Sequence, residues 1–427
     1  MTTWLTPLTA TPPGRRSPRR MQSPDLRPWP VIRYGLTSPL HLRSLVAADR
    51  GYAGGPPDAQ EDRMAIELIG MIGVRPEGAD GAAVHVIGGE VDLGWVRDFS
   101  RAHEQAGFDK VLVGYTATSA DGFLVSSYAA AHTARLGYLI AHRPGFVAPT
   151  LAARKAATLD QLSGGRVALH IITGGSDADQ ARDGDYADHD TRYRRTDEYL
   201  GLMRRMWTEE RPFDHAGEFY RVTKAGSDVK PIQKPHIPLY FGGASEAAHR
   251  IGARHCDVYM LWGEPLAAIR DRIAAVRAAA ARVGRDPREL RFSVSLRPII
   301  APTEAEAWAK ARGILERVQA KQGDRTLPLP EAVGARRLVD FAEQAEVHDK
   351  RLWTPIAAAV GGAGNTTALV GTPEQVAESL LDYYDLGVST LLIRGFDPLA
   401  DAAEYGRELI PLVRGGAARR DRDRPAA

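Results

Sequence analysis

The sequence predicts an α/β fold in which eight parallel strands, each followed by a helix, close into a (β/α)8 barrel. Short apolar runs alternate with helical patterns from Met64 to Arg414, and the alternation occurs eight times, as a closed parallel barrel requires. A doubly wound sheet produces the same alternation and remains an alternative on this observation. A long insertion at 321–388 follows a late strand, and such insertions usually lie over the active-site face of a barrel.

The strands are predicted from apolar runs of four to eight residues. In chain order they cover 66–71, 110–114, 136–141, 166–172, 237–241, 256–260, 291–298 and 389–394. Helical patterns follow most of them, at 91–106, 122–133, 149–162, 195–207, 245–253, 264–283, 303–320 and 401–412. The helix at 264–283 has the clearest pattern, because Ile269, Ile273 and Val276 recur at helical spacing while Arg270 and Arg272 fall off that apolar stripe. A further short helix is expected at 373–385 within the insertion.

The composition excludes several classes of protein. Of the 427 residues, 44% are apolar and 25% are charged, which is typical of a soluble globular protein with a large core. A net charge of +2 does not indicate nucleic acid or a membrane surface as a partner, and no apolar run is long enough to span a bilayer. Because Cys256 is the single cysteine, an intrachain disulfide and a cysteine-based metal site are excluded. We expect a cytoplasmic protein without a metal, and a buried thiol at Cys256.

Both ends of the chain differ from its centre. Residues 1–63 contain ten of the 28 prolines and nine arginines but no lysine, with no sustained hydrophobic periodicity. Such a segment cannot bury enough apolar surface to offset its ordering entropy. The sequence therefore predicts a disordered Pro/Arg-rich arm at 1–63, one barrel domain at 64–414 and a disordered tail at 415–427.

Deleting residues 1–63 is accordingly expected to leave the melting temperature unchanged, because that segment has no core pattern. Thermal denaturation of the full-length and shortened proteins, followed side by side, measures this directly. A large loss of stability on deletion would show that the arm packs against the barrel.

Three motifs contain candidate ligand-binding residues, and the first is Arg143-Pro144-Gly145-Phe146 with Pro149 shortly after it. Arg143 follows a predicted strand directly, at the C-terminal strand end where barrel enzymes place ligand-binding groups. The motif also has a purely structural explanation, because Pro149 suits the first turn of a helix.

The second motif is His189-Asp190-Thr191-Arg192-Tyr193. His189 and Tyr193 are four residues apart, so one helical turn would point both side chains the same way. An imidazole and a phenol on one helix face can donate hydrogen bonds to an anion. The spacing also fits the ordinary start of a surface helix.

The third motif is the run from Tyr240 through Phe241, Gly242, Gly243 and Ala244 to Ser245, a strand that enters a Gly-Gly turn and then a helix. Glycines let the backbone approach a ligand closely, and a helix N-terminus offers unpaired N–H groups. Ser245 is placed to cap the helix, and its hydroxyl could also donate to a phosphate.

Together with the run at 152–166 (AARKAATLDQLSGGR) and with Trp262-Gly263-Glu264-Pro265, these motifs resemble the bacterial-luciferase-like flavin-dependent monooxygenases. The alkanesulfonate monooxygenase branch is the most similar, over about Met64 to Arg414. The resemblance implies a (β/α)8 barrel that uses reduced FMN and O2. It also implies a separate NAD(P)H-dependent flavin reductase as partner, and a homodimer or homotetramer.

The resemblance further implies roles for individual residues. Its cofactor-binding positions are Thr173, His189, Tyr193, Gly243 and Ser245, with the flavin phosphate near His189, Tyr193 and Ser245. Its catalytic and substrate-contacting positions are Trp262, Arg297 and Tyr383. The remaining pocket positions are Ser119, Arg143, Ile299 and Val360.

Three of these pocket positions depart from the alkanesulfonate pattern. Ile299 stands in place of a histidine, Val360 in place of an arginine and Ser119 in place of a cysteine. Each lost cationic partner removes a hydrogen bond worth roughly 1.5–3 kcal/mol to a sulfonate, so FMN is better supported than a sulfonate substrate.

We therefore expect a two-component FMN-dependent monooxygenase that oxidises a small organic substrate, with an organosulfur compound as the leading candidate. Two alternatives remain open. One is a deazaflavin-dependent oxidoreductase on the same barrel, and the other is a non-catalytic flavin-binding protein whose pocket has lost its function.

Overall fold

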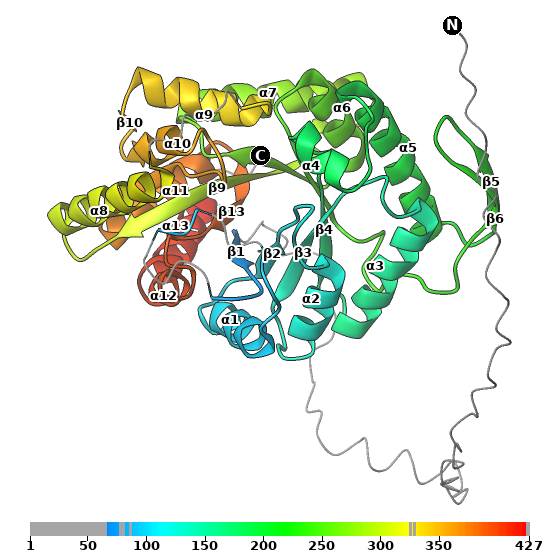
Figure 1. Cartoon of the computed structure of the whole chain (residues 1–427), viewed down its shortest axis with the longest axis horizontal. Coiled ribbons are helices and arrows are strands. Elements are labelled where there is room, and N and C mark those ends of the chain that lie inside the picture. Colours follow the sequence, from blue (N-terminus) through cyan, green and yellow to red (C-terminus); the bar gives the residue numbers. More distant parts are fainter. Residues whose placement is uncertain (1–65, 77–81, 85–87, 324–326, 328–329, 424–427) are drawn as a thin grey trace, which may run out of the picture. The chain divides into compact units, whose positions relative to one another are not determined.

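Eight parallel strands close into a barrel in this computed structural model, which describes residues 66–76, 82–84, 88–323, 327 and 330–423 (Figure 1). The strands are β1 Glu67–Ile72, β2 Lys110–Val113, β3 Gly137–His142, β4 Val167–Ile171, β7 Leu239–Gly242, β8 Val258–Trp262, β9 Arg291–Ile300 and β13 Val388–Ile393. They pair in this order, and β9 closes the ring by pairing with both β8 and β13. The predicted barrel is confirmed, and the doubly wound alternative is wrong.

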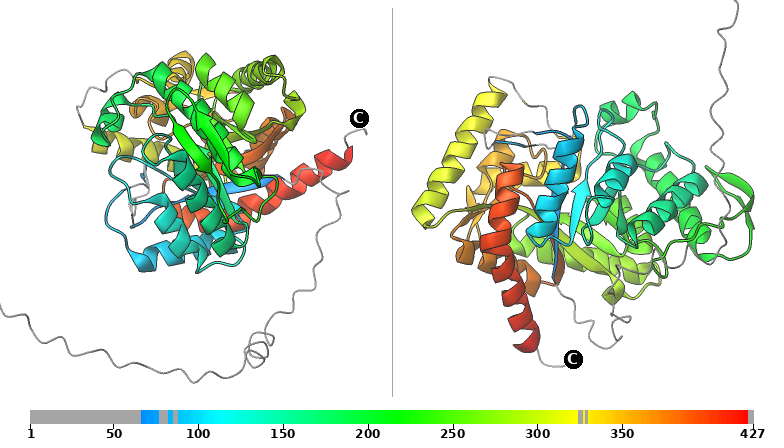
Figure 2. Two further views of the ribbon diagram at one scale, coloured as in Figure 1. Left: turned by 90° about the vertical axis from the view of Figure 1, so that its right-hand side faces the viewer. Right: turned by 90° about the horizontal axis from the view of Figure 1, so that it is seen from below.

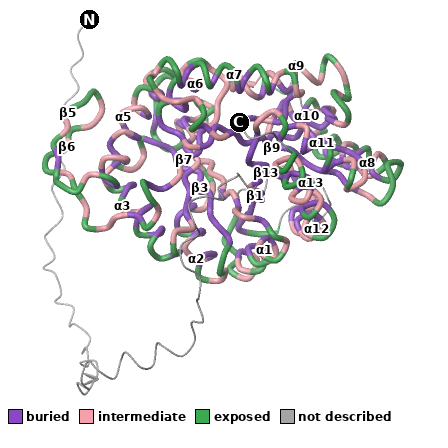
Figure 3. The backbone as a smooth tube through the Cα atoms, turned by 180° about the vertical axis from the view of Figure 1, so that it is seen from behind, coloured by how far each residue is buried: buried purple, intermediate pink, exposed green. Residues whose placement is uncertain are grey.

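Helices surround the barrel and bury their apolar faces against it, while their outer faces are exposed (Figure 3). They are α1 Leu93–Gln105, α2 Gly122–Ala130, α3 Pro149–Ser163, α5 His189–Thr208, α6 Glu246–His255, α7 Leu266–Arg282, α8 Glu304–Gln322 and α11 Pro373–Asp385. Local signals fix several of their ends. Pro149 begins α3, Gly164 ends it in a left-handed conformation at φ 71°, and a capping box at Thr303 begins α8. Among the described helices, none is long and apolar enough to cross a bilayer.

Alternate residues of each strand fill the barrel in layers. At the N-terminal end, Glu67 pairs with Lys110 and accepts hydrogen bonds from the hydroxyls of Tyr240 (2.7 Å) and Thr390 (3.0 Å). Above this polar floor lies an apolar layer, formed by Ile69, Leu112, Leu139, Ala168, Val258 and Leu392. The interior is therefore packed, which leaves the C-terminal mouth as the place for a site.

Strand β9 is longer than the barrel and joins a second, smaller set of strands. Its first half pairs with β8 and β13, while Arg297–Ile300 pair in parallel with β12 (Ala368–Gly371). The insertion also forms α9 Val333–Gln344, β10 Val347–His348, β11 Leu352–Trp353 and α10 Pro355–Ala359. Outside the insertion, α4 (Asp177–Arg182) and the hairpin of β5 (Phe213–Ala216) and β6 (Arg221–Ala225) are further elements that the apolar pattern does not predict.

The C-terminal segment corrects one prediction. In place of a helix at 401–412 and a disordered tail from Gly415, the chain forms α12 (Pro398–Glu404), a π-helical turn (Tyr405–Leu409) and α13 (Ile410–Asp423), which runs along the barrel and projects past it (Figure 2). Gly416 and Ala417 are buried, and Arg420 pairs with Asp385 (2.9 Å) and Glu378 (3.0 Å) of α11. Arg420, in the segment predicted to be disordered, thus binds a neighbouring helix. The predicted arm at 1–63 lies outside the described residues.

Candidate functional site

A cavity of about 570 Å³ opens at the C-terminal ends of β4, β7 and β8. Six of the residues predicted to bind ligands line it, namely Thr173, His189, Tyr193, Gly243, Ser245 and Trp262. They lie at three strand ends and at the start of α5. These segments span 90 residues of the sequence, from Thr173 to Trp262, and the barrel brings them together.

The turn after β7 forms a narrow cradle on the cavity wall. Gly243 has φ 157°, and a Cβ atom there would collide with the side chain of Ala248, so only glycine fits. Ser245 caps α6, its hydroxyl accepting a hydrogen bond from the backbone N–H of Ala248 at 3.2 Å. The cavity therefore meets the N-terminal end of a ten-residue helix, which favours an anion there.

Across from this cradle, His189 and Tyr193 lie on one face of α5. Their ring centroids are 4.6 Å apart, as the i, i+4 spacing predicts. Burial raises the pKa of the Tyr193 phenol, and the nearby Ser245 hydroxyl offsets part of that rise. Tyr193 is therefore a hydrogen-bond donor at neutral pH and is placed beside the helix cap.

A buried arginine supplies positive charge behind the cradle. Arg272 of α7 is 8% exposed, and its Nη2 donates to the Gly243 carbonyl at 2.6 Å. Its Nε has no hydrogen-bond partner, and neither has the buried hydroxyl of Thr173 on the same cavity. The pattern at 264–283 placed Arg272 off the apolar stripe, where solvent is expected, and that expectation is wrong because this side of α7 faces the cavity.

The insertion roofs the cavity, as its position after a late strand predicts. Residues 331–334 and Arg336 line the cavity, and Gly334 lies against the Trp262 ring, with a Cβ there meeting the indole at 3.4 Å. Glu264, next to Trp262, is 1% exposed and forms two hydrogen bonds with Arg337 of α9, at 2.8 and 2.6 Å. This bidentate ion pair fixes α9 to the end of β8.

His170 also lines the cavity, and the motif analysis missed it. It lies on β4 with its side chain inside the barrel, and burial lowers its pKa to about 4. No hydrogen bond to it occurs among the described residues, so a neutral imidazole faces the cavity with both nitrogens available. Alternation along 167–171 places Ala168 and His170 on one face of the strand, which is the signal that could have found it.

Arg297 does not reach this cavity. It is 1% exposed, and its five N–H groups all donate to backbone carbonyls, those of Ala83 (2.7 Å), Val84 (2.5 Å), Gly364 (3.2 Å), Asn365 (3.3 Å) and Gly395 (3.3 Å). Its guanidinium also lies 4.5 Å from the Phe396 ring centroid. In this structure every donor of Arg297 joins loops to one another, so its contact with a substrate stays a prediction.

Tyr383 is likewise engaged with the backbone. It lies on α11, does not line the cavity, and donates its hydroxyl to the Glu264 carbonyl at 2.9 Å. Burial raises the pKa of this phenol well above its usual value. The Tyr383 phenol is therefore protonated and held by a backbone carbonyl, and its catalytic role stays a prediction.

The side chains of two further predicted pocket residues form ion pairs or hydrogen bonds with other protein groups. Arg143 is 6% exposed and pairs with Asp179 (2.6 Å) and Asp183 (3.6 Å), with the Tyr115 ring 4.6 Å away. The hydroxyl of Ser119 donates to the Thr116 carbonyl at 2.9 Å. The cavity with the phosphate-type cradle does not include either residue among its described lining.

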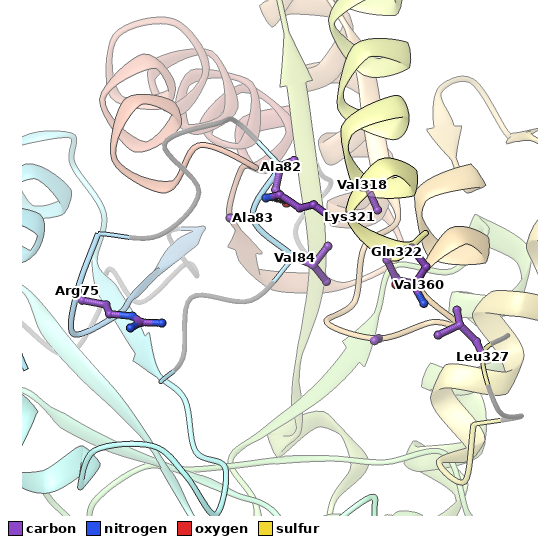
Figure 4. Close-up of a pocket in the computed structure, with 10 residues that line it drawn as sticks. Arg75, Ala82, Ala83, Val84, Val318, Lys321, Gln322, Leu327 and Val360 are labelled. Atoms are coloured by element: carbon purple, nitrogen blue, oxygen red, sulfur yellow. Dashed lines mark hydrogen bonds between the residues drawn. The ribbon is translucent and has the colours of Figure 1, made fainter. Parts of the chain in front are cut away.

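Val360 lines a second cavity of about 570 Å³, between the end of α8, the segment after α10 and described residues of the loop after β1 (Figure 4). Its walls include Val84, Val318 and Leu327. Ile299 does not line it. Its side chain is 1% exposed in the small core between α8 and β12, because position 299 belongs to the part of β9 that has left the barrel.

Comparisons with known proteins agree with this fold. A family described as luciferase-like monooxygenase matches residues 72–390. Riboflavin lyase RcaE, solved with modified FMN and riboflavin, is 20% identical with a TM-score of 0.67, over 82% of this chain and 92% of that chain. EDTA monooxygenase EmoA from Chelativorans sp. BNC1 is 20% identical at 0.66, over 82% and 94%. An F420-dependent secondary alcohol dehydrogenase is 18% identical at 0.60, over 82% and 99%. Structural likeness at these identities shows the fold alone.

Proposed function

The chain belongs to the luciferase-like monooxygenase family, and from this premise we propose that it is a two-component monooxygenase that uses reduced FMN and O2 to oxidise a small organic substrate. One observation carries the choice of cofactor. The cavity at the ends of β4, β7 and β8 unites all five predicted cofactor-binding residues with the buried guanidinium of Arg272, whose Nε has no hydrogen-bond partner. A negatively charged phosphate satisfies that arrangement.

The residues present fit FMN. Ser245, Tyr193 and His189 would hold the phosphate, with Arg272 behind the Gly243 carbonyl as a further positive charge. Thr173 and His170, whose side chains have no hydrogen-bond partner among the described residues, would contact the ring system together with the indole of Trp262. FMN, when bound and reduced, supplies the oxygen-activating chemistry, and the protein contributes position, electrostatics and exclusion of water.

Exclusion of water falls to the roof. The Glu264–Arg337 ion pair holds α9 over the cavity, and the backbone N–H of Asp177 donates to Glu331 at 3.0 Å on the opposite side. The reaction then takes place under a cover fixed at two strand ends. The proposal includes an NAD(P)H-dependent flavin reductase as the source of reduced FMN. It also includes a homodimer or homotetramer and an organosulfur substrate.

Anaerobic titration with reduced FMN, followed by rapid mixing with O2, tests this function. We expect saturable binding, and reoxidation that passes through an absorbance transient absent from free reduced FMN, because the roofed cavity shields the bound cofactor from water. A screen of sulfonates, sulfones and thioethers with a coupled reductase then identifies the substrate.

Three results would contradict the proposal, and each has its own meaning. Reoxidation identical to that of free reduced FMN, with tight binding, would indicate a non-catalytic flavin carrier. Binding of a deazaflavin in preference to FMN, with no reaction with O2, would indicate a hydride-transferring oxidoreductase. Failure to bind either cofactor would show that the cavity has another ligand.

A further inference from the structure

A second buried cation lies at the barrel mouth, on the side away from the cradle. Arg394 directly follows β13, on which Thr390 and Leu392 point into the barrel. Because side chains alternate along a strand, Arg394 continues the inward series at the C-terminal end, where barrel enzymes bind their ligands. The residue is partly exposed, and it lines a small cavity together with Met71 and Tyr405.

The hydrogen bonds of Arg394 leave much of its guanidinium unused. Nη1 donates to the Met71 sulfur at 2.9 Å, Nη2 donates to the Gly364 carbonyl, and the buried Nε has no partner. A guanidinium has five N–H groups, and a thioether sulfur is a weak acceptor. Donors therefore remain at this position for a ligand.

No carboxylate neutralises this charge in the part of the chain that the structure describes. Arg297 lies close enough to interact with it electrostatically, and the positive charge of Arg297 adds to the local potential. Arg297 also donates to Gly364, and all of its donors are engaged by carbonyls. Burial of an uncompensated cation is costly, and binding of an anion removes that cost. Of the two arginines, only Arg394 has free donors to bind one.

The position of Arg394 separates it from the proposed phosphate site. In the closed barrel, β13 lies four strands from β4 in either direction, whereas the cradle belongs to β7 beside β4. The two anion-favouring groups thus stand on opposite sides of the mouth, with the inward-facing His170 on the side of the cradle.

We propose that Arg394 is the anion-binding residue of the substrate site, and that the substrate is a small organic anion, a carboxylate or a sulfonate. The identification of this anion as the substrate rests on the proposed function, whereas the anion site itself does not. Arg394 is here a specificity-determining residue, since it would select the charge of the molecule that enters opposite the cofactor phosphate.

The test uses the intact protein loaded with oxidised FMN, so no turnover is needed. Sodium butyrate and ethanesulfonate are titrated at constant ionic strength, with 1-butanol as the neutral probe, and binding is followed by calorimetry and by melting temperature. We expect saturable binding of both anions that Arg394→Met weakens about ten- to hundred-fold, because a charge-assisted hydrogen-bond pair is lost. Arg394→Lys should retain most of the affinity, and 1-butanol should not distinguish the variants.

Arg250→Met is the matched control, because it removes one positive charge from an exposed position on α6. It should bind the anions as the wild type does. Equal anion responses in wild type and Arg394→Met, or no response in either, would overturn the proposal. A loss of FMN affinity in Arg394→Met without a change in anion binding would also overturn it and assign Arg394 to the cofactor. Failure of the oxygen reaction leaves these readouts unaffected, so the two proposals fail separately.

Discussion

Arg297→Ala is expected to lower the free energy of unfolding by about 3–5 kcal/mol, because buried carbonyls lose a charged donor and a cavity is left behind. The five carbonyls belong to three segments that are distant in sequence, around residues 83–84, 364–365 and 395. Arg297→Lys should not restore the stability, since one ammonium group cannot reproduce the planar fork of a guanidinium. Chemical denaturation measures all three proteins.

The exposed Arg250 again provides a control, because Arg250→Ala should change the stability by less than about 0.5 kcal/mol. A stable but inactive Arg297→Ala would support the substrate contact that the family resemblance implies. If Arg297→Ala is as stable as the wild type but cannot turn over substrate, Arg297 contacts substrate in a conformation different from this one.

Ser245→Asp should weaken FMN binding about 100-fold or more while leaving the fold intact. A carboxylate facing the phosphate at close range costs several kcal/mol. Aspartate caps helices as well as serine does, so α6 should keep its N-terminus. Riboflavin has no phosphate, and its affinity should change by less than about three-fold, a difference of about 0.6 kcal/mol. Fluorescence titration of both flavins gives the comparison.

Ser245→Asn separates charge from shape, because asparagine is also a good cap but carries no charge. It should lose far less FMN affinity than the aspartate variant. Parallel losses for FMN and riboflavin in Ser245→Asp would mean that the phosphate binds elsewhere, and Arg272 would then lack its assigned ligand.

The strands and the cofactor side of the site could be predicted because their signals are local. Apolar runs mark all eight barrel strands to within about two residues, and the Gly-Gly turn with Ser245 marks a strand end and a helix start together. Once the barrel places such ends on one face, His189, Tyr193 and Trp262 meet there without further information.

The substrate side could not be predicted because its chemistry depends on long-range contacts. Position 297 carries the expected arginine, yet its donors are taken by carbonyls from loops over 200 residues away, such as that of Ala83. Arg143 has its charge neutralised by Asp179 of the α4 segment, a helix with no clear apolar pattern. Arg394 is the reverse case, because the sequence did not predict it as a ligand-binding residue. Nothing in its local sequence distinguishes it from the end of an ordinary strand. Which face of β4 carries His170 inward also depends on tertiary packing.

The polar layer at the N-terminal end of the barrel determines where ligands can enter. Glu67, Lys110, Tyr240 and Thr390 plug the N-terminal end, and the apolar layer above them is filled. The described barrel strands leave no opening at the N-terminal end, so ligands enter and leave the barrel at its C-terminal end. Cofactor and substrate therefore share one entrance, and the part of the mouth that one of them fills limits the size of the other.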